Sequence, residues 1–302
     1  MIESDLGDLE CIHCHNELSF HKIIHKEEKV IRTAVVSCSG CSRKFAILEY
    51  VLIMLSSTDA KQLLPDNLLD EYVVLISNCD DDSSYVTNKA MRSGANWKKQ
   101  FAGDFIVTKY SLDSDGFWGA QAFWNFCGLE PSQINNQDIM VYCGGTGRET
   151  YHLLAAEPTR VFVLDLGSHL FNIPSLCQPH ISKLVLILSD FYFNPIKPNT
   201  ATISICDHAL QHIEDNKSAF RYIVDNTKEG GMISICVYSH ENNIIVTHMI
   251  EPSKRVLHKL NLEWQKRSAF FPAVFLYAIY TVSYLINFIW SQRTSSSVFL
   301  ST

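Results

Sequence analysis

Four cysteines near the start of the chain have the spacing of a metal site. They form two CxxC pairs, Cys11 with Cys14 and Cys38 with Cys41, and 23 residues separate the pairs. Each pair can form a tight knuckle that directs two thiolates toward one tetrahedral ion. Four thiolates leave no coordination position open, so we expect a structural Zn²⁺ ion rather than a catalytic one.

Two alternatives remain open for this cluster. The four cysteines could be unrelated, and nearby histidines could compete as ligands, namely His13, His15, His21 and His25. Between the pairs, FHKIIHKEEKVIRTAVVSC predicts two strands around a charged turn. Such a small module has little core of its own, so we expect the metal to supply the missing stability.

A second group of residues has the spacing of a nucleotide site. The apolar run DIMVYC ends in a glycine turn, GGTG at 144–147, and a helical segment follows. This order lets backbone N–H groups approach a nucleotide closely. Asp165 lies 18 residues after Gly147 and ends the next apolar run, where an acid can accept both hydroxyls of a ribose. Because GGTG lacks the G-x-G-x-x-G spacing of a pyrophosphate turn, it fits a dinucleotide less well.

These side chains need a scaffold that brings the ends of several strands together. Five apolar runs alternate with helical segments between residues 138 and 238, namely DIMVYC, RVFVLDLG, KLVLILSD, TATISIC and MISICVY. Such alternation predicts a parallel sheet with helices on both faces, and ligands bind at the carboxyl ends of its strands. The glycine turn, Asp165 and Asp190 all fall at such ends. The predicted fold class is therefore α/β and Rossmann-like, with a small β-rich module at the N-terminus.

Helices are expected where apolar residues recur at helical spacing, over NLLDEYVVLIS, RETYHLLAAEP and ALQHIEDNKSAFRYIVDNT. We expect Gly230 and Gly231 to turn the chain into the fifth strand. Four regions follow: the zinc module at 1–56, a linker and helical, aromatic-rich lid segment at 57–130, the core at 131–240, and a hydrophobic helical segment at 241–302.

The glycine turn and the acids after it follow a known pattern. GGTGRET matches the second half of a motif with three alternating glycines, and ALQHI followed by KEGGMISI matches a later one. On these residues the core resembles the class I S-adenosylmethionine-dependent methyltransferases, in particular the ubiquinone-biosynthesis type. The resemblance implies that Asp165 holds the ribose of S-adenosyl-L-methionine and that Asp190 contacts its adenine amino group. The implied cofactor-binding residues are Gly144, Gly145, Gly147, Asp165, Asp190 and Phe191.

Two positions depart from that pattern. The acid of the first motif aligns with Val141, and its first glycine aligns with Cys143. In the family this acid helps to orient the methionyl end of the cofactor. The alternative hypothesis is therefore a catalytically inactive binding or scaffold protein that keeps the methyltransferase fold.

The N-terminal module resembles a second family. Cys38 to Leu55 contains both cysteines of the second pair, followed by Phe45, Ile47 and Leu55 in the order found in the zinc ribbon of the small activator subunit of tRNA and protein methyltransferases. This resemblance implies a module that packs beside, or within, a methyltransferase.

Methyl transfer needs a base only where the acceptor must lose a proton. His208, Asp207 and His212 follow the fourth predicted strand, beside the expected acceptor, and are the candidates. We expect the acceptor to be a small molecule or a lipid-like compound.

The bulk properties narrow the partners and the location. The chain has 302 residues and a net charge of −7, which gives no strong nucleic-acid signal. Its acidic start lacks an apolar run, so we expect no secretory signal and a cytoplasmic protein. Residues 268–292 carry no charge and are long enough to span a bilayer. A transmembrane helix, a helix lying on a membrane and a lid helix packed on the core are the alternatives.

Overall fold

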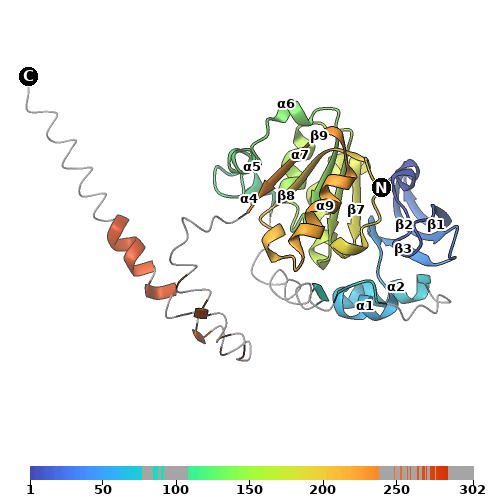
Figure 1. The fold of residues 1–302 in the computed structure, drawn as a ribbon, viewed down its shortest axis with the longest axis horizontal. Coiled ribbons are helices and arrows are strands. Elements are labelled where there is room, and N and C mark those ends of the chain that lie inside the picture. Colours follow the sequence, from blue (N-terminus) through green and yellow to red (C-terminus); the bar gives the residue numbers. More distant parts are fainter. Residues whose placement is uncertain are drawn as a thin grey trace, which may run out of the picture. The chain divides into compact units, whose positions relative to one another are not determined.

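The computed structural model describes residues 1–76, 84–87, 90–91 and 108–237, together with isolated positions between 248 and 284. The chain divides into two units, Met1–Tyr238 and Ser239–Thr302 (Figure 1). In the second unit, residues 277–284 are helical. Among the described positions, no helix is long and apolar enough to cross a membrane. A membrane contact through 268–292 stays a prediction.

The N-terminal module is an antiparallel sheet. Its strands are β1 (Leu18–Glu27), β2 (Val30–Cys38), β3 (Lys44–Leu48) and β4 (Val51–Ile53), and a 3-10 helix (Glu3–Asp8) precedes them. The predicted hairpin between the two cysteine pairs is thus confirmed. Glu49 and Tyr50 join β3 to β4 with φ values of 45° and 70°. Both values are positive, as a two-residue hairpin turn of type I′ requires.

Five parallel strands follow, and all five were predicted. They are β5 (Asp138–Tyr142), β6 (Arg160–Asp165), β7 (Leu184–Leu188), β8 (Ala201–Asp207) and β9 (Thr227–Cys236). In space the order is β7-β6-β5-β8-β9. From β5 the strands are added on one side up to β7 and then on the other side from β8 to β9, so the topological switch point lies between β5 and β8. The predicted Rossmann-like α/β class is confirmed.

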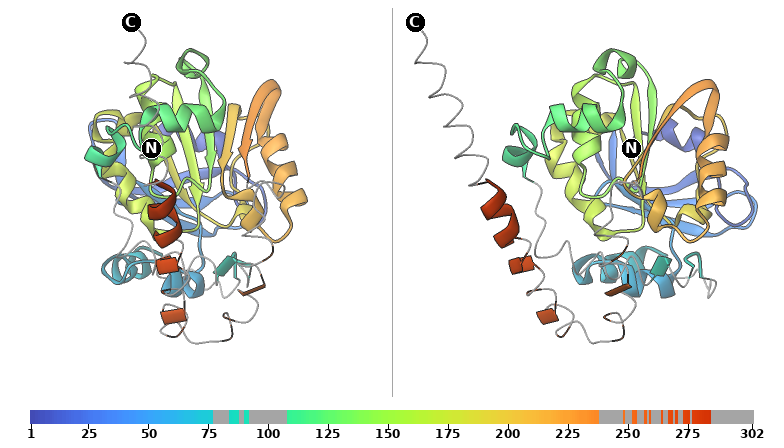
Figure 2. Two further views of the ribbon diagram at one scale, coloured as in Figure 1. Left: turned by 90° about the vertical axis from the view of Figure 1, so that its left-hand side faces the viewer. Right: turned by 60° about the vertical axis from the view of Figure 1, so that its left-hand side comes forward.

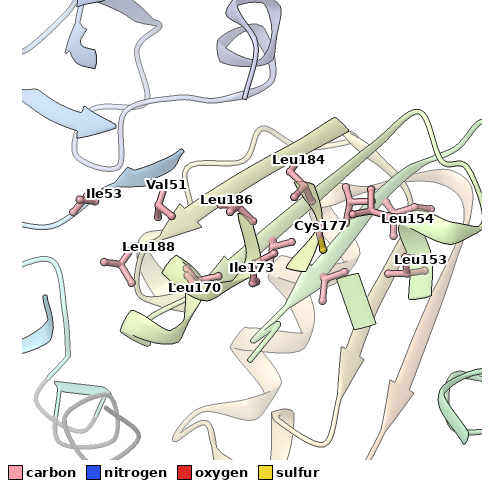
Figure 3. Packing of buried hydrophobic residues seen from close by; sticks show 14 of the residues in the cluster. Val51, Ile53, Leu153, Leu154, Leu170, Ile173, Cys177, Leu184, Leu186 and Leu188 are labelled. Atoms are coloured by element: carbon pink, nitrogen blue, oxygen red, sulfur yellow. The ribbon is translucent and has the colours of Figure 1, made fainter. Parts of the chain in front are cut away.

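The module and the parallel strands belong to one sheet. β4 pairs with β7 in parallel, with Val51 opposite Leu186 and Ile53 opposite Leu188, which makes a nine-stranded sheet (Figure 1). Figure 3 shows side chains of β4 and β7 in one apolar layer, which continues over Leu170 and Ile173. Each part therefore covers a sheet edge that the other would expose.

Helices cover both faces of the parallel strands (Figure 2). On one face α7 (Arg148–Ala155) and α8 (Ile173–Leu176) pack on side chains such as Ile139 and Val141. On the other face α9 (Asn216–Asn226) packs with Met140 and Tyr142. This alternation along β5 follows from the two-residue period of a strand.

The described part of the segment before the parallel strands contains several helices. It contains α1 (Ser57–Leu63), α2 (Asp66–Ile76), α4 (Lys109–Leu112), α5 (Ala120–Cys127) and α6 (Pro131–Ile134). α2 was predicted, whereas α1 was missed. The side chain of Ser56 accepts a hydrogen bond from the Asp59 N–H at 3.1 Å and caps α1. Positions 77–83, 88–89 and 92–107 of the expected lid segment lie outside the described residues.

Two local expectations need correction. The helix expected from Ala209 starts only at Asn216, because Asp215 caps it by accepting a hydrogen bond from the Ser218 N–H at 3.1 Å. The glycine pair lies within β9 rather than before it. The pairing of β8 with β9 shifts between Thr227 and Met232, and Gly230 lies in this irregularity with a φ of 75°.

Candidate functional site

The four cysteines of the two CxxC pairs converge in the N-terminal module. The sulfur of Cys11 lies 3.6 Å from that of Cys41, and the sulfur of Cys14 lies 3.3 Å from that of Cys38. All four sulfurs lie within 4.8 Å of one another. A tetrahedral zinc ion with Zn–S bonds of about 2.3 Å needs sulfurs about 3.8 Å apart. The donor set therefore fits one zinc ion.

Backbone N–H groups around the cluster are directed at one of its sulfurs. The N–H groups of Gly40 and Cys41 point to the Cys38 sulfur at 3.3 and 3.5 Å. A Cβ at residue 40 would lie only 2.5 Å from Nδ2 of Asn16, so a side chain in this knuckle would have to displace Asn16. Among the described residues no histidine joins the cluster. His15, one of the expected competitors, pairs with Glu10 at 2.7 Å.

The glycine turn lies at the carboxyl end of β5, as predicted. A Cβ at Gly144 would lie 2.4 Å from Cγ1 of Val163, and one at Gly147 would lie 2.9 Å from Cγ1 of Ile173. Gly147 also has a φ of 96°. The turn therefore lies against β6 and α8 at a distance that side chains would prevent.

Asp165 holds this turn in place from the end of β6. Its Oδ2 accepts a hydrogen bond from the Gly145 N–H at 2.9 Å, and its Oδ1 accepts one from the Gly167 N–H at 2.7 Å. The Nε2 atom of His169 lies 3.3 Å from Oδ2. Burial on its own would raise the pKa of Asp165, but His169 and the two N–H groups lower it below its usual value. The carboxylate is therefore ionised at neutral pH.

Asp190 and Phe191 lie at the end of β7. The buried carboxylate of Asp190 accepts hydrogen bonds from the N–H groups of Thr87 at 2.9 Å and Tyr192 at 3.2 Å. Burial raises the pKa of Asp190. Phe191 stacks on Tyr142 with ring centroids 4.9 Å apart. Contact of either residue with a cofactor stays a prediction.

A buried ion pair lies beside the turn, and the sequence analysis missed it. Nη2 of Arg148, the first residue of α7, donates to Oδ2 of Asp207 at 3.1 Å. The rings of Phe117 and Phe126 lie 4.9 and 5.6 Å from the guanidinium. The sequence could have indicated this ion pair. An arginine directly after the glycine turn lies close to the carboxyl ends of the strands, where Asp207 was expected.

Glu149 is a second residue that was missed. Burial raises its pKa to about 7, against an opposing effect of Arg148, and Asp207 and Asp165 contribute further to the increase. Its carboxyl thus lies in the field of the acids that end β6 and β8.

By contrast Val141, which aligns with the family acid, is a buried residue of the apolar core.

Two of the three candidates for a general base are in contact with each other. Nδ1 of His208 lies 2.6 Å from Oδ1 of Asp207 at the end of β8. His212 lies further on, in the 3-10 helix Leu210–His212. Its backbone N–H donates to the Ala209 carbonyl at 2.9 Å. The structure therefore brings Asp207 and His208 together.

No protein-family model and no curated protein matches the chain. Among solved structures it is similar to a chain of the complex that contains the Haloferax volcanii Trm112 methyltransferase activator, with 16% identity and a TM-score of 0.40 over 50% of this chain and 66% of that one. It is also similar to Haemonchus contortus phosphoethanolamine N-methyltransferase 1, with 13% identity and a TM-score of 0.41 over 49% of this chain and 32% of that one. The second such enzyme of that organism gives 14% identity and a TM-score of 0.36 over 50% and 39%.

The chain thus spans at most 66% of the length of these neighbours. At TM-scores of 0.36 to 0.41 these similarities carry no inference about activity. The class that the strand order defines is a Rossmann-like α/β protein with an N-terminal four-cysteine module.

Proposed function

We propose that the chain is an S-adenosyl-L-methionine-dependent methyltransferase that carries a structural zinc module. The observation that carries this proposal is the hydrogen bond between the glycine turn after β5 and the ionised Asp165 at the end of β6. This pairing places backbone N–H groups and an acid at the point where a nucleoside binds such a sheet.

Asp165 can serve both the turn and a ribose. A carboxylate offers about four lone-pair sites. Gly167 uses one site on Oδ1, whereas Oδ2 accepts from Gly145 and faces His169, so Oδ1 can accept a further hydrogen bond from a hydroxyl. Asp190 would contact the adenine, and Gly144 and Gly147 would let the cofactor approach the backbone.

The cofactor, when bound, supplies a methyl group that its sulfonium has already activated. The chain's own residues then align the acceptor and exclude water. Phe117 and Phe126, which cover Arg148, are suited to exclude water at the ends of β8 and β9. His208, which lies beside Asp207, would take a proton from an acceptor that must lose one. A small or lipid-like acceptor is the proposed substrate class.

The alternative is a binding or scaffold protein with this fold and no catalysis. Two observations favour it. Val141 is an apolar core residue where the family has an acid, and Asp190 already binds the Thr87 backbone.

Calorimetry with S-adenosylhomocysteine and S-adenosylmethionine separates the two. We expect binding by the native chain and at least about tenfold weaker binding by Asp165→Asn, because a lost charge-assisted hydrogen bond costs roughly 1.5–3 kcal/mol. Asp225→Asn, on an exposed part of α9, makes the same chemical change away from the site and should bind normally. No binding of either ligand at millimolar concentration would refute the methyltransferase and leave the scaffold.

A further inference from the structure

A thiol, an imidazole and a carboxylate form a line at the ends of β8 and β9. Asp207 and Cys236 are register partners in the parallel pair, and His208 follows Asp207. The sulfur of Cys236 lies 3.5 Å from Nε2 of His208, and Nδ1 of the same ring lies 2.6 Å from Oδ1 of Asp207. The two ring nitrogens therefore face different partners.

The backbone holds the imidazole in this position. The His208 N–H donates to the Cys236 carbonyl at 2.8 Å, beyond the last paired residues of the two strands. His208 has a φ of 52°, in the left-handed region where histidine is enriched together with asparagine and aspartate.

The carboxylate is held in turn. Oδ2 of Asp207 accepts the hydrogen bond from buried Arg148 at 3.1 Å, and Oδ1 lies 2.6 Å from Nδ1 of His208 without the alignment of a hydrogen bond. The edge of the Phe126 ring contacts the imidazole, with centroids 5.6 Å apart. A nucleophile within reach of a base is the arrangement that activates thiols and hydroxyls in covalent catalysis.

We propose that Cys236 is a reactive nucleophile for soft carbon electrophiles, with His208 as its base. In the reaction the sulfur lone pair forms the new S–C bond, and the leaving group departs with the electrons of the broken bond. The thiol proton passes to Nε2 of His208 and then to solvent. This site does not depend on the proposed methyl transfer.

The base matters because the thiol is otherwise a poor nucleophile. Burial, and next to it the charge of Asp207, raises the pKa of Cys236. A thiol in that environment is largely protonated at neutral pH and needs a partner that removes its proton.

Cys143 offers a matched comparison within the chain. It is partly exposed like Cys236, and burial raises its pKa well above the usual value. Among the described residues, no imidazole lies within hydrogen-bond distance of its sulfur. The two thiols differ in the presence of His208 and also in burial, which raises the pKa of Cys143 further, so the His208→Asn variant is the decisive comparison.

The experiment measures alkylation of the folded, zinc-loaded chain by iodoacetamide at pH 7, with each cysteine followed by peptide mass spectrometry. We expect Cys236 to react at least about tenfold faster than Cys143, since a positioned base contributes about a hundredfold or more in enzymes. His208→Asn should abolish this advantage. Asparagine tolerates the positive φ of this position, and an unchanged thermal midpoint would show that the variant folds.

Two results would overturn the proposal: equal rates at Cys236 and Cys143 in the native chain, or an undiminished Cys236 rate in His208→Asn. A third concerns metal. If the purified chain holds a second zinc ion that Cys236→Ser removes, the cluster binds a cation and the thiol is not a free nucleophile.

Discussion

At the start of α7, the Glu149 carboxyl lies in the field of two further acids, Asp165 and Asp207, with Arg148 as a nearby cation. Its side chain is only 15% exposed. An ionised carboxylate there loses most of its hydration, and the single guanidinium is already paired with Asp207. This accounts for the increase in the pKa of Glu149 to about 7.

This shift gives a pH dependence of stability with a definite sign. The pKa of Glu149 is 4.5 without the fold and about 7 within it, so folding takes up a proton between these values. The free energy of unfolding therefore falls as the pH rises through this interval. Relative to the native chain, Glu149→Gln should become more stable by roughly 3 kcal/mol from pH 4.5 to pH 8.

Denaturant unfolding of both chains at several pH values measures this difference. Glu229→Gln, which removes an exposed carboxylate of β9, is the control and should show a much smaller trend. A difference between Glu149→Gln and the native chain that does not change with pH would contradict the argument.

Replacement of Gly144 should lower the stability of the fold. A methyl group there would approach Cγ1 of Val163 to 2.4 Å, and Val163 is a stiff, buried residue in the middle of β6. We expect Gly144→Ala to lower the free energy of unfolding by about 1–3 kcal/mol. It should also displace the Gly145 N–H from Asp165.

Urea unfolding measures the first effect, and S-adenosylhomocysteine calorimetry measures the second. Gly7→Ala is the matched control, because a methyl group at that position meets no atom within 4 Å. If Gly144→Ala is as stable as Gly7→Ala, the turn does not lie as close to β6 as described.

At the scale of elements, the five parallel strands were predictable because each is a continuous apolar run. A strand that is buried on both faces of a sheet requires such a run. The knuckles were predictable because metal geometry restricts the spacing of CxxC pairs. The pairing of β4 with β7 was not predictable from the sequence. It joins segments more than 130 residues apart, and the sequence of a strand does not indicate which strand it pairs with. The glycine pair was misplaced for a related reason. A bulge inside a strand and a turn before it have the same local sequence signal.

The site shows the same limit. Asp165 and the turn were placed at strand ends by the period of the βα series, yet their mutual hydrogen bond depends on the register between β5 and β6. The ion pair between Arg148 and Asp207 joins residues on two elements, so composition at either position does not reveal it.

The zinc module can be tested as an element. Metal analysis of the native chain should give one zinc per chain, and the double variant Cys38→Ser, Cys41→Ser should lose it, because two hydroxyls cannot replace two thiolates at the ion. Cys177→Ser, at a buried cysteine directly after α8, is the control and should retain the zinc. A native chain without zinc would refute the metal site.

At the scale of the whole first unit, the module and the parallel strands share both of their apolar layers. Val51 and Ile53 belong to the layer that contains Leu186, and Leu52 belongs to the opposite layer, with Ile187. Parallel backbone pairing of β4 with β7 adds a hydrogen bond from the Met54 N–H to the Leu188 carbonyl at 2.9 Å. Loss of the module would expose an edge of the sheet and one side of each layer.

Removal of zinc should therefore destabilise residues far from the cysteines. All five tryptophans lie outside 1–56, so their fluorescence reports on the rest of the chain. We expect a chelator to lower the midpoint of the tryptophan-monitored thermal transition by more than about 5 °C, since 1 kcal/mol corresponds to about 2–4 °C in a unit of this size.

The same chelator should leave the midpoint of the Cys38→Ser, Cys41→Ser variant unchanged, because that variant has no zinc to lose. Far-ultraviolet circular dichroism records the module and the remaining sheet together. Two separate transitions, with the tryptophan signal unmoved by the chelator, would show that the module folds independently of the parallel strands. A single shifted transition in both signals is the result that one continuous sheet requires, because the metal then stabilises β4 and β4 stabilises the edge of β7.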